Sequence, residues 1–71
     1  MKGATNHLTI GQKVRHYRRR RGMSQRVLAE LAGRTVSWIE KIESGRAQLQ
    51  TLPTIKLIAN VLDIAPHELL P

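Results

Sequence analysis

Apolar residues recur at helical spacing along most of the chain. Such stripes run through residues 10–17, 27–32, 39–42 and 55–62, and a shorter apolar segment starts at Pro66. No segment alternates with the period of two that is typical of a strand. The pattern therefore predicts an all-α domain, a compact bundle of five short helices with the last starting at Pro66.

Residues that favour helix ends separate these stripes. Side chains that can cap a helix N-terminus precede the first three stripes: Thr9, Ser24 and Thr35. Gln12 completes a capping box with Thr9, and Pro53 suits the first turn of the fourth helix. Glycines that can end a helix follow the same three stripes: Gly22, Gly33 and Gly45. The helix boundaries are therefore marked by local signals.

The inward positions of the stripes predict the core. It is aliphatic and holds no phenylalanine. Its expected members are Ile10, Val14, Met23, Leu28, Leu31, Ala32, Ile39, Ile42, Leu52, Ile55, Ile58, Ala59 and Leu62. Small aliphatic side chains of this kind suit short helices that pack closely, but they leave little stability to spare.

The remaining organisation is simple. Residues 1–8 show no periodicity and are predicted to form a flexible N-terminal arm, followed by one domain over residues 9–71. A chain of 71 residues buries only about 60% of the surface that its unfolded form exposes, which leaves little room for a deep cleft. The sequence also lacks paired carboxylates, a Ser/His/Asp set and a glycine-rich phosphate loop. We therefore expect a binding module and not an enzyme.

Composition excludes several kinds of site. The chain has no cysteine, and His7, His16 and His67 do not have zinc-ligand spacing. No metal and no cofactor are predicted. No apolar stretch is long enough to span a membrane, and the first ten residues lack the apolar core of a signal peptide. A cytoplasmic protein is the expectation that follows.

The net charge of +7 is unevenly distributed. Residues 11–46 hold ten Lys and Arg against Glu30, Glu40 and Glu43, a sum of +7, whereas Lys56 against two acidic residues gives residues 47–71 a sum of −1. A cationic two-thirds joined to a near-neutral remainder favours a surface that binds a polyanion.

The segment SQRVLAELAGRTVSWIEKIESG, residues 24–45, predicts two short helices joined by a tight turn. Gly33 provides the residue without a Cβ that such a turn needs. Ala29 is small where the two helices must approach, and Ile39 fills the angle between them. This geometry lets one helix lie in a DNA major groove while the other crosses the backbone.

This segment and its flanks resemble the Cro/phage-repressor (Xre) type of helix-turn-helix domain over about residues 10–70. The residues that match the family pattern at its spacing are Gly11, Val14, Arg18, Gly22, Ser24, Gln25, Leu28, Ala29, Gly33, Ile39, Ile42, Glu43 and Gly45. The loop after Gly45 departs from the commonest length, and Asp63 stands where the family usually has glycine. The resemblance implies a lambda-repressor-like fold and a repressor-like transcriptional regulator, bacterial or phage-like, that binds double-stranded DNA sequence-specifically.

The helix at about residues 36–44 is expected to read the major groove. When its isoleucines face inward, steps of 100° per residue place Ser37 and Lys41 outward. The resemblance puts Val36 and Ser37 at base edges with Lys41 one turn later, and we include Trp38 in the base-reading set. Lys41 can donate to guanine, and Val36 can contact a thymine methyl. For Trp38, contact with the sugar-phosphate wall and half-buried packing between helices remain equal alternatives.

Contacts to phosphate are expected around this helix. The candidates are Gln25, Arg34, Thr35, Arg46 and Gln48. The role of Gln25, a phosphate contact that also braces a base-reading side chain, is implied by the resemblance. Phosphate contacts fix the register of a protein on DNA and carry little sequence information. Glu40 is expected to pair with a nearby arginine in preference to reading a cytosine amino group.

Two further sets have expected structural roles. The resemblance implies a partly buried ion pair between Arg18 and Glu43. Apolar residues beyond the needs of a minimal core could form a dimer patch or could simply close the core: Leu49, Ile64, Leu69 and Leu70. A homodimer on a palindromic site would place its two recognition helices about 34 Å apart.

Three other functions stay open. The same fold serves as the DNA-binding antitoxin of a toxin–antitoxin pair, which would bring a protein partner, and as the controller of a restriction–modification operon. From another class, the domain could be a protein-interaction adaptor that no longer reads DNA, although its basic face argues against this.

Overall fold

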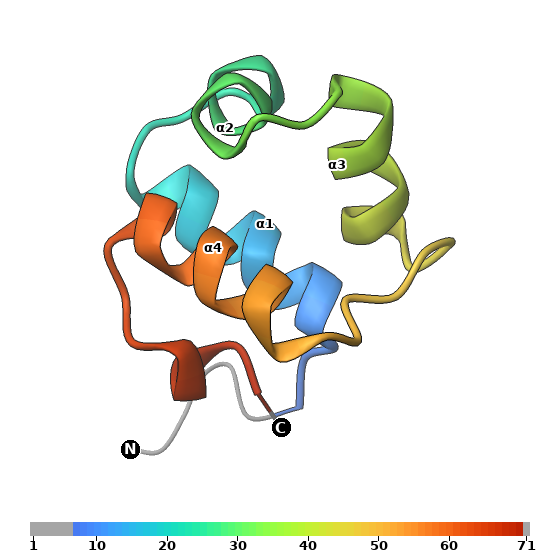
Figure 1. Ribbon diagram of the computed structural model, residues 1–71, viewed down its shortest axis with the longest axis vertical. Coiled ribbons are helices and arrows are strands. Elements are labelled where there is room, and N and C mark those ends of the chain that lie inside the picture. Colours follow the sequence, from blue (N-terminus) through green and yellow to red (C-terminus); the bar gives the residue numbers. More distant parts are fainter. Residues whose placement is uncertain (1–6, 71) are drawn as a thin grey trace.

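The computed structural model describes residues 7–70, and all regular elements among these residues are helices, with no strand. The four α-helices are α1 (Ile10–Arg20), α2 (Gln25–Ala32), α3 (Val36–Ser44) and α4 (Leu52–Leu62). Figure 1 shows α1 and α4 layered at the centre, with α2 and α3 set around one end of them. The helix-turn-helix therefore rests on a two-helix base.

The predicted count of five α-helices is wrong. The expected fifth helix is a single turn of 3-10 helix, η1 (Pro66–Glu68). The backbone nitrogens of Glu68, Leu69 and Leu70 each donate to the carbonyl three residues earlier, at 3.0, 3.0 and 3.2 Å. This tight pattern suits short pieces of helix, and here it turns Leu69 fully into the core.

The helix boundaries follow the capping signals. Thr9 and Gln12 form the expected capping box, with reciprocal bonds of 2.9 and 3.1 Å. Ser24 and Thr35 each accept a backbone N–H of their helix at 3.1 Å. Asp63 ends α4 in the left-handed conformation at φ 60°, where glycine has no steric cost and aspartate is one of the few tolerated alternatives.

The core differs from the prediction at several positions. Leu31 and Leu52 are exposed by 59% and 50%, so their assignment to the core is wrong. Leu31 lies on the flank of α2, about 100° from Ala32, whose face is buried. Leu52 opens α4 one turn before the buried stripe of that helix begins. Ile10 and Met23 are half-buried against the core.

Leu49 and Leu69 belong to the core and not to an exposed dimer patch. Their exposed fractions are 5% and 0%. Ile64 and Leu70 are half-buried and pack against the same core. Of the two roles open to these residues, closing the core is therefore the one that Leu49 and Leu69 have within one chain.

The N-terminal arm can be followed only in part. Residues 1–6 of the expected arm lie outside the described residues. His7 and Leu8 form a turn and a bend that lead into Thr9. Residue 9, at which the predicted domain begins, is the N-cap of α1.

Candidate nucleic-acid interface

The turn between α2 and α3 is short and is held by local hydrogen bonds. Gly33 ends α2 in the left-handed conformation at φ 68°, and the Arg34 backbone nitrogen donates to the Ala29 carbonyl at 2.9 Å. Thr35 then caps α3. These local interactions hold α2 and α3 at a fixed angle.

One edge of α3 faces solvent along its length. Ile39 and Ile42, 0% and 3% exposed, anchor the helix from behind. Ser37 and Lys41 are exposed, as expected, and Ser44 joins them one turn later. Nothing in residues 7–70 covers this edge, so it is free to enter a groove.

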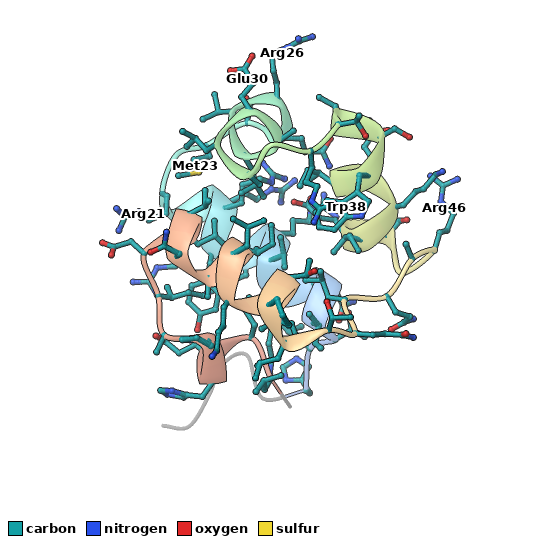
Figure 2. The ribbon with its side chains drawn as sticks, in the orientation of Figure 1. Arg21, Met23, Arg26, Glu30, Trp38 and Arg46 are labelled. Atoms are coloured by element: carbon teal, nitrogen blue, oxygen red, sulfur yellow. The ribbon has the colours of Figure 1, made fainter. Side chains whose placement is uncertain are left out.

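The two flanks of α3 differ from its centre. Val36 is half-buried and packs against the core, which limits it to an edge contact. Trp38 is also half-buried, and Figure 2 shows it on the side of α3 that faces the rest of the molecule. This position favours the packing alternative for most of its ring.

Trp38 also forms part of a polar hollow. The Arg34 guanidinium carbon lies 5.0 Å from the Trp38 ring centroid, a cation–π distance. The hollow between α3 and the start of α4 has a volume of about 200 Å³. It is lined by Arg34, Trp38, Gln48, Leu49, Gln50, Thr51 and Thr54. Two of the expected phosphate contacts, Arg34 and Gln48, therefore come together on this side of α3.

The opposite flank holds a buried ion pair. Arg18 Nε and the Glu43 carboxylate are 2.6 Å apart, a second guanidinium nitrogen donates to the other carboxylate oxygen at 3.0 Å, and a third donates to the Met23 carbonyl at 2.8 Å. The side chains are 9% and 4% exposed. Geometry this complete fixes α3 against α1.

Gln25 is drawn into the same network. Its amide nitrogen donates to Glu43 at 3.1 Å, which orients the side chain at the start of α2. An amide nitrogen carries two hydrogens, so one remains for a phosphate. The bracing expected of Gln25 thus acts here on a buried carboxylate, and not on a base-reading side chain.

A second polar hollow, of about 470 Å³, lies beside this pair. Its lining comes from three helices: Arg15, Arg18, Arg19, Ser24, Gln25, Glu40, Glu43 and Ser44. Arg15 and Arg19 were not singled out by the sequence pattern. The only signal for them in the sequence was their position near Arg18: Arg15 lies three residues before it and Arg19 one residue after it.

The remaining candidates lie at the rim. Figure 2 shows Arg46 pointing away from the body of the protein beyond the end of α3, and its Nε donates to Ser44 Oγ at 3.2 Å. Thr35 is exposed, and its hydroxyl hydrogen is free to donate, because the oxygen serves as the cap acceptor. These two positions bracket α3 at its two ends.

The expected pairing of Glu40 is wrong. Among residues 7–70 the ion pairs are Arg18–Glu43 and Arg21–Asp63, so Glu40 has none. It is exposed at the rim of the larger hollow. Because Glu43 is neutralised by Arg18, the exposed edge of α3 holds Lys41 against Glu40 and carries no net charge, so attraction for a polyanion must come from its surroundings.

No group of His, Asp or Glu side chains in residues 7–70 is arranged to hold a metal ion. None of the described helices has the length and apolar character needed to cross a bilayer.

Residues 9–70 match the family model described as a helix-turn-helix domain. The HTH-type transcriptional regulator SinR of Bacillus subtilis is 41% identical in an alignment of 64 residues, and the match covers 86% of this chain and 55% of that protein. SinR of Bacillus licheniformis matches equally. The chain thus spans about half the length of these relatives.

Solved structures agree with this match. The restriction-modification controller protein C.AhdI from Aeromonas hydrophila has a TM-score of 0.78 at 38% identity, over 84% of this chain and 89% of that one. SinR, described as a master regulator for biofilm formation and solved in complex with DNA, has a TM-score of 0.82 at 33% identity, over 89% of this chain and 100% of that one. A SinR/SinI complex matches with a TM-score of 0.79 at 34% identity, over 87% of this chain and 60% of that one.

Proposed function

The chain belongs to the helix-turn-helix domain family, as a DNA-binding domain of the Cro/phage-repressor (Xre) type, and from this premise we propose that it is a repressor-like transcriptional regulator that reads the major groove with α3. The observation that carries the proposal is the open edge of α3, backed by buried Ile39 and Ile42 and flanked by two polar hollows. A helix in a major groove has a phosphate wall on each side, which matches this arrangement.

Base readout is assigned to the edge of α3. Lys41 can donate to the acceptors of guanine, and Ser37 can donate or accept. Val36 and Trp38, both half-buried, have their remaining exposed atoms for a thymine methyl and the groove wall. Val36 and Trp38 therefore support Lys41 and Ser37 and contribute less to sequence specificity.

Phosphate contact is assigned to the rim of the site. Arg34 and Gln48 line one hollow, Gln25 lines the other, and Thr35 and Arg46 lie at the two ends of α3. These groups supply hydrogen bonds and positive charge on both sides of a helix whose exposed edge carries no net charge. They position the protein, whereas α3 selects the sequence.

The test compares Lys41→Ala with Arg46→Ala on an operator selected from random DNA and on a scrambled duplex. Lys41→Ala should weaken operator binding by about 1–3 kcal/mol and bring the two affinities together. Arg46→Ala should weaken both duplexes alike and lower the salt slope by about 1. Lys56→Ala, an exposed lysine on α4, is the matched control.

Several results would contradict the proposal. Wild-type protein that prefers no sequence over random DNA would remove the claim of specific readout. An affinity that does not change with salt would contradict the proposed phosphate contacts. About six to ten such contacts should lower the affinity about 10³–10⁵-fold between 50 and 200 mM salt. An exchange of the two phenotypes would reverse the assigned roles.

Assembly and location follow from the proposed function. A homodimer on a palindromic site is proposed, with half-buried Ile64 and Leu70 as the remaining members of the apolar patch. The stoichiometry on the selected operator measures this directly, and a single-copy complex on an asymmetric site would contradict it. Access to bacterial DNA places the protein in the cytoplasm.

Control of a restriction–modification operon is a second candidate. The observation that favours it is the similarity to C.AhdI, of which this chain covers 89%. Restriction and methyltransferase genes beside the coding sequence would support this candidate. Their absence would favour the first proposal, a transcriptional regulator outside a restriction–modification operon.

A further inference from the structure

Arg15 and Arg19 form an exposed cationic pair on α1 outside the helix-turn-helix. They are four residues apart, so their side chains lie one above the other on one face of the helix. Both line the hollow shared with α2 and α3, and both also line a more open hollow on the outer side of α1. The pair thus runs along the border of the proposed DNA site.

The charge around this pair is unbalanced. In the hollow beside α3, Arg18 and Glu43 neutralise one another, which leaves Arg15 and Arg19 against Glu40 alone. Neither arginine has a carboxylate partner within residues 7–70. The hollow therefore carries an excess of positive charge without an internal counter-ion.

The pair adds little to the fold beyond the favourable position of Arg19 in the last turn of α1. Helix α1 has no acidic residue, and like charges four residues apart destabilise a helix by about 0.2–0.5 kcal/mol. Both side chains are exposed and fill no part of the core. An external anion would relieve this repulsion, so the arrangement favours an anionic ligand.

The position of the hollow identifies which anion fits. Ser24 and Gln25 at the start of α2 line it, and Glu40 and Ser44 form its border on α3. A ligand held there would run alongside the recognition edge, opposite the hollow that contains Arg34 and Gln48. Two phosphate strands that enclose α3 would occupy these two sides.

We infer that Arg15 and Arg19 bind the sugar-phosphate backbone of the duplex on the α1 side of α3, extending the DNA contact beyond residues 24–45. This inference rests on the proposed function and adds backbone contacts without base readout. It also supplies attraction that the exposed edge of α3, with Lys41 offset by Glu40, lacks.

The experiment compares the double variant Arg15→Ala/Arg19→Ala with the charge-matched control Arg21→Ala/Lys56→Ala. Figure 2 shows Arg21 on the side of the molecule opposite α3, and Lys56 is exposed on α4. Fluorescence anisotropy is measured from 50 to 400 mM salt on the selected operator and on a scrambled duplex of equal length. Circular dichroism verifies that both variants remain folded.

Loss of two phosphate contacts should lower the salt slope by about 1.8, because each contact contributes about 0.9. If variant and wild type bind equally at 1 M salt, this difference in slope makes the variant bind about 60-fold more weakly than wild type at 0.1 M salt. The fall should be the same on both duplexes, so the ratio of operator to scrambled affinity stays constant. The control variant should keep the wild-type slope.

Two outcomes overturn the inference: an unchanged slope in the Arg15→Ala/Arg19→Ala variant, or an equal fall in the control. An unchanged slope would show that Arg15 and Arg19 do not contact the phosphates. An equal fall in the control would show that the effect comes from net charge and not from these two positions. Either one leaves the proposed function intact if wild-type protein still prefers its operator. Loss of that preference in wild-type protein would instead refute the proposed function, while the slope comparison on scrambled DNA still decides the contact.

Discussion

Replacing Gly11 by alanine should destabilise the domain, although alanine favours helices more than glycine does. Gly11 is buried in the first turn of α1. A methyl group at this position would overlap the backbone carbonyl oxygen of Ile42 and come within 3.0 Å of its carbonyl carbon and 3.3 Å of Glu43 Cα. The obstacle is therefore the backbone of α3, which cannot move aside as a flexible side chain could.

Two opposing effects set the magnitude. Alanine gains about 1 kcal/mol over glycine in helix propensity. Overpacking a tight contact costs about 1–3 kcal/mol, and a backbone obstacle points to the upper end of that range. The net expectation is a loss of about 2 kcal/mol. For a domain of this size that lowers Tm by about 8–16 °C.

Chemical denaturation followed by circular dichroism measures this loss. Arg15→Ala, on the exposed side of the same helix, is the control and should change stability by less than about 0.5 kcal/mol. The Gly11→Ala variant should also bind its operator more weakly although its charge is unchanged, because α3 must shift away from α1. Unchanged or increased stability would refute the proposed close approach of α1 and α3.

The remaining predictions concern one buried and one exposed residue. Arg18→Met should lower the free energy of unfolding, measured by urea denaturation, by about 3–5 kcal/mol, because Glu43 is then left buried without its partner. A loss below about 1 kcal/mol would show that Glu43 is solvated in the native state. Asp63→Ala should be about 1 kcal/mol less stable than Asp63→Gly, because both lose the exposed pair with Arg21 but only alanine is strained at φ 60°. Equal Tm values for the two variants would contradict the left-handed conformation at this position.

The recognition edge of α3 illustrates what could be predicted from local pattern. Steps of 100° from two inward isoleucines are enough to place Ser37 and Lys41 on the outer face, and both are exposed. Glu40 shows the limit of such reasoning. Whether it meets an arginine depends on where α1 lies beside α3, and the guanidinium of Arg18 is already held by Glu43.

The sequence by itself determined the helices and their ends, because capping boxes, left-handed glycines and hydrophobic periodicity act within about four residues along the chain. Family membership followed from the same local spacing. The tertiary structure alone decided which apolar residues are buried: Leu49 and Leu69 enter the core, while Leu31 and Leu52 remain exposed. It also brought Gly11 against Ile42, and Arg15 and Arg19 beside α3. These contacts depend on how the helices cross, which is set by the packing of all their side chains together and by no single segment.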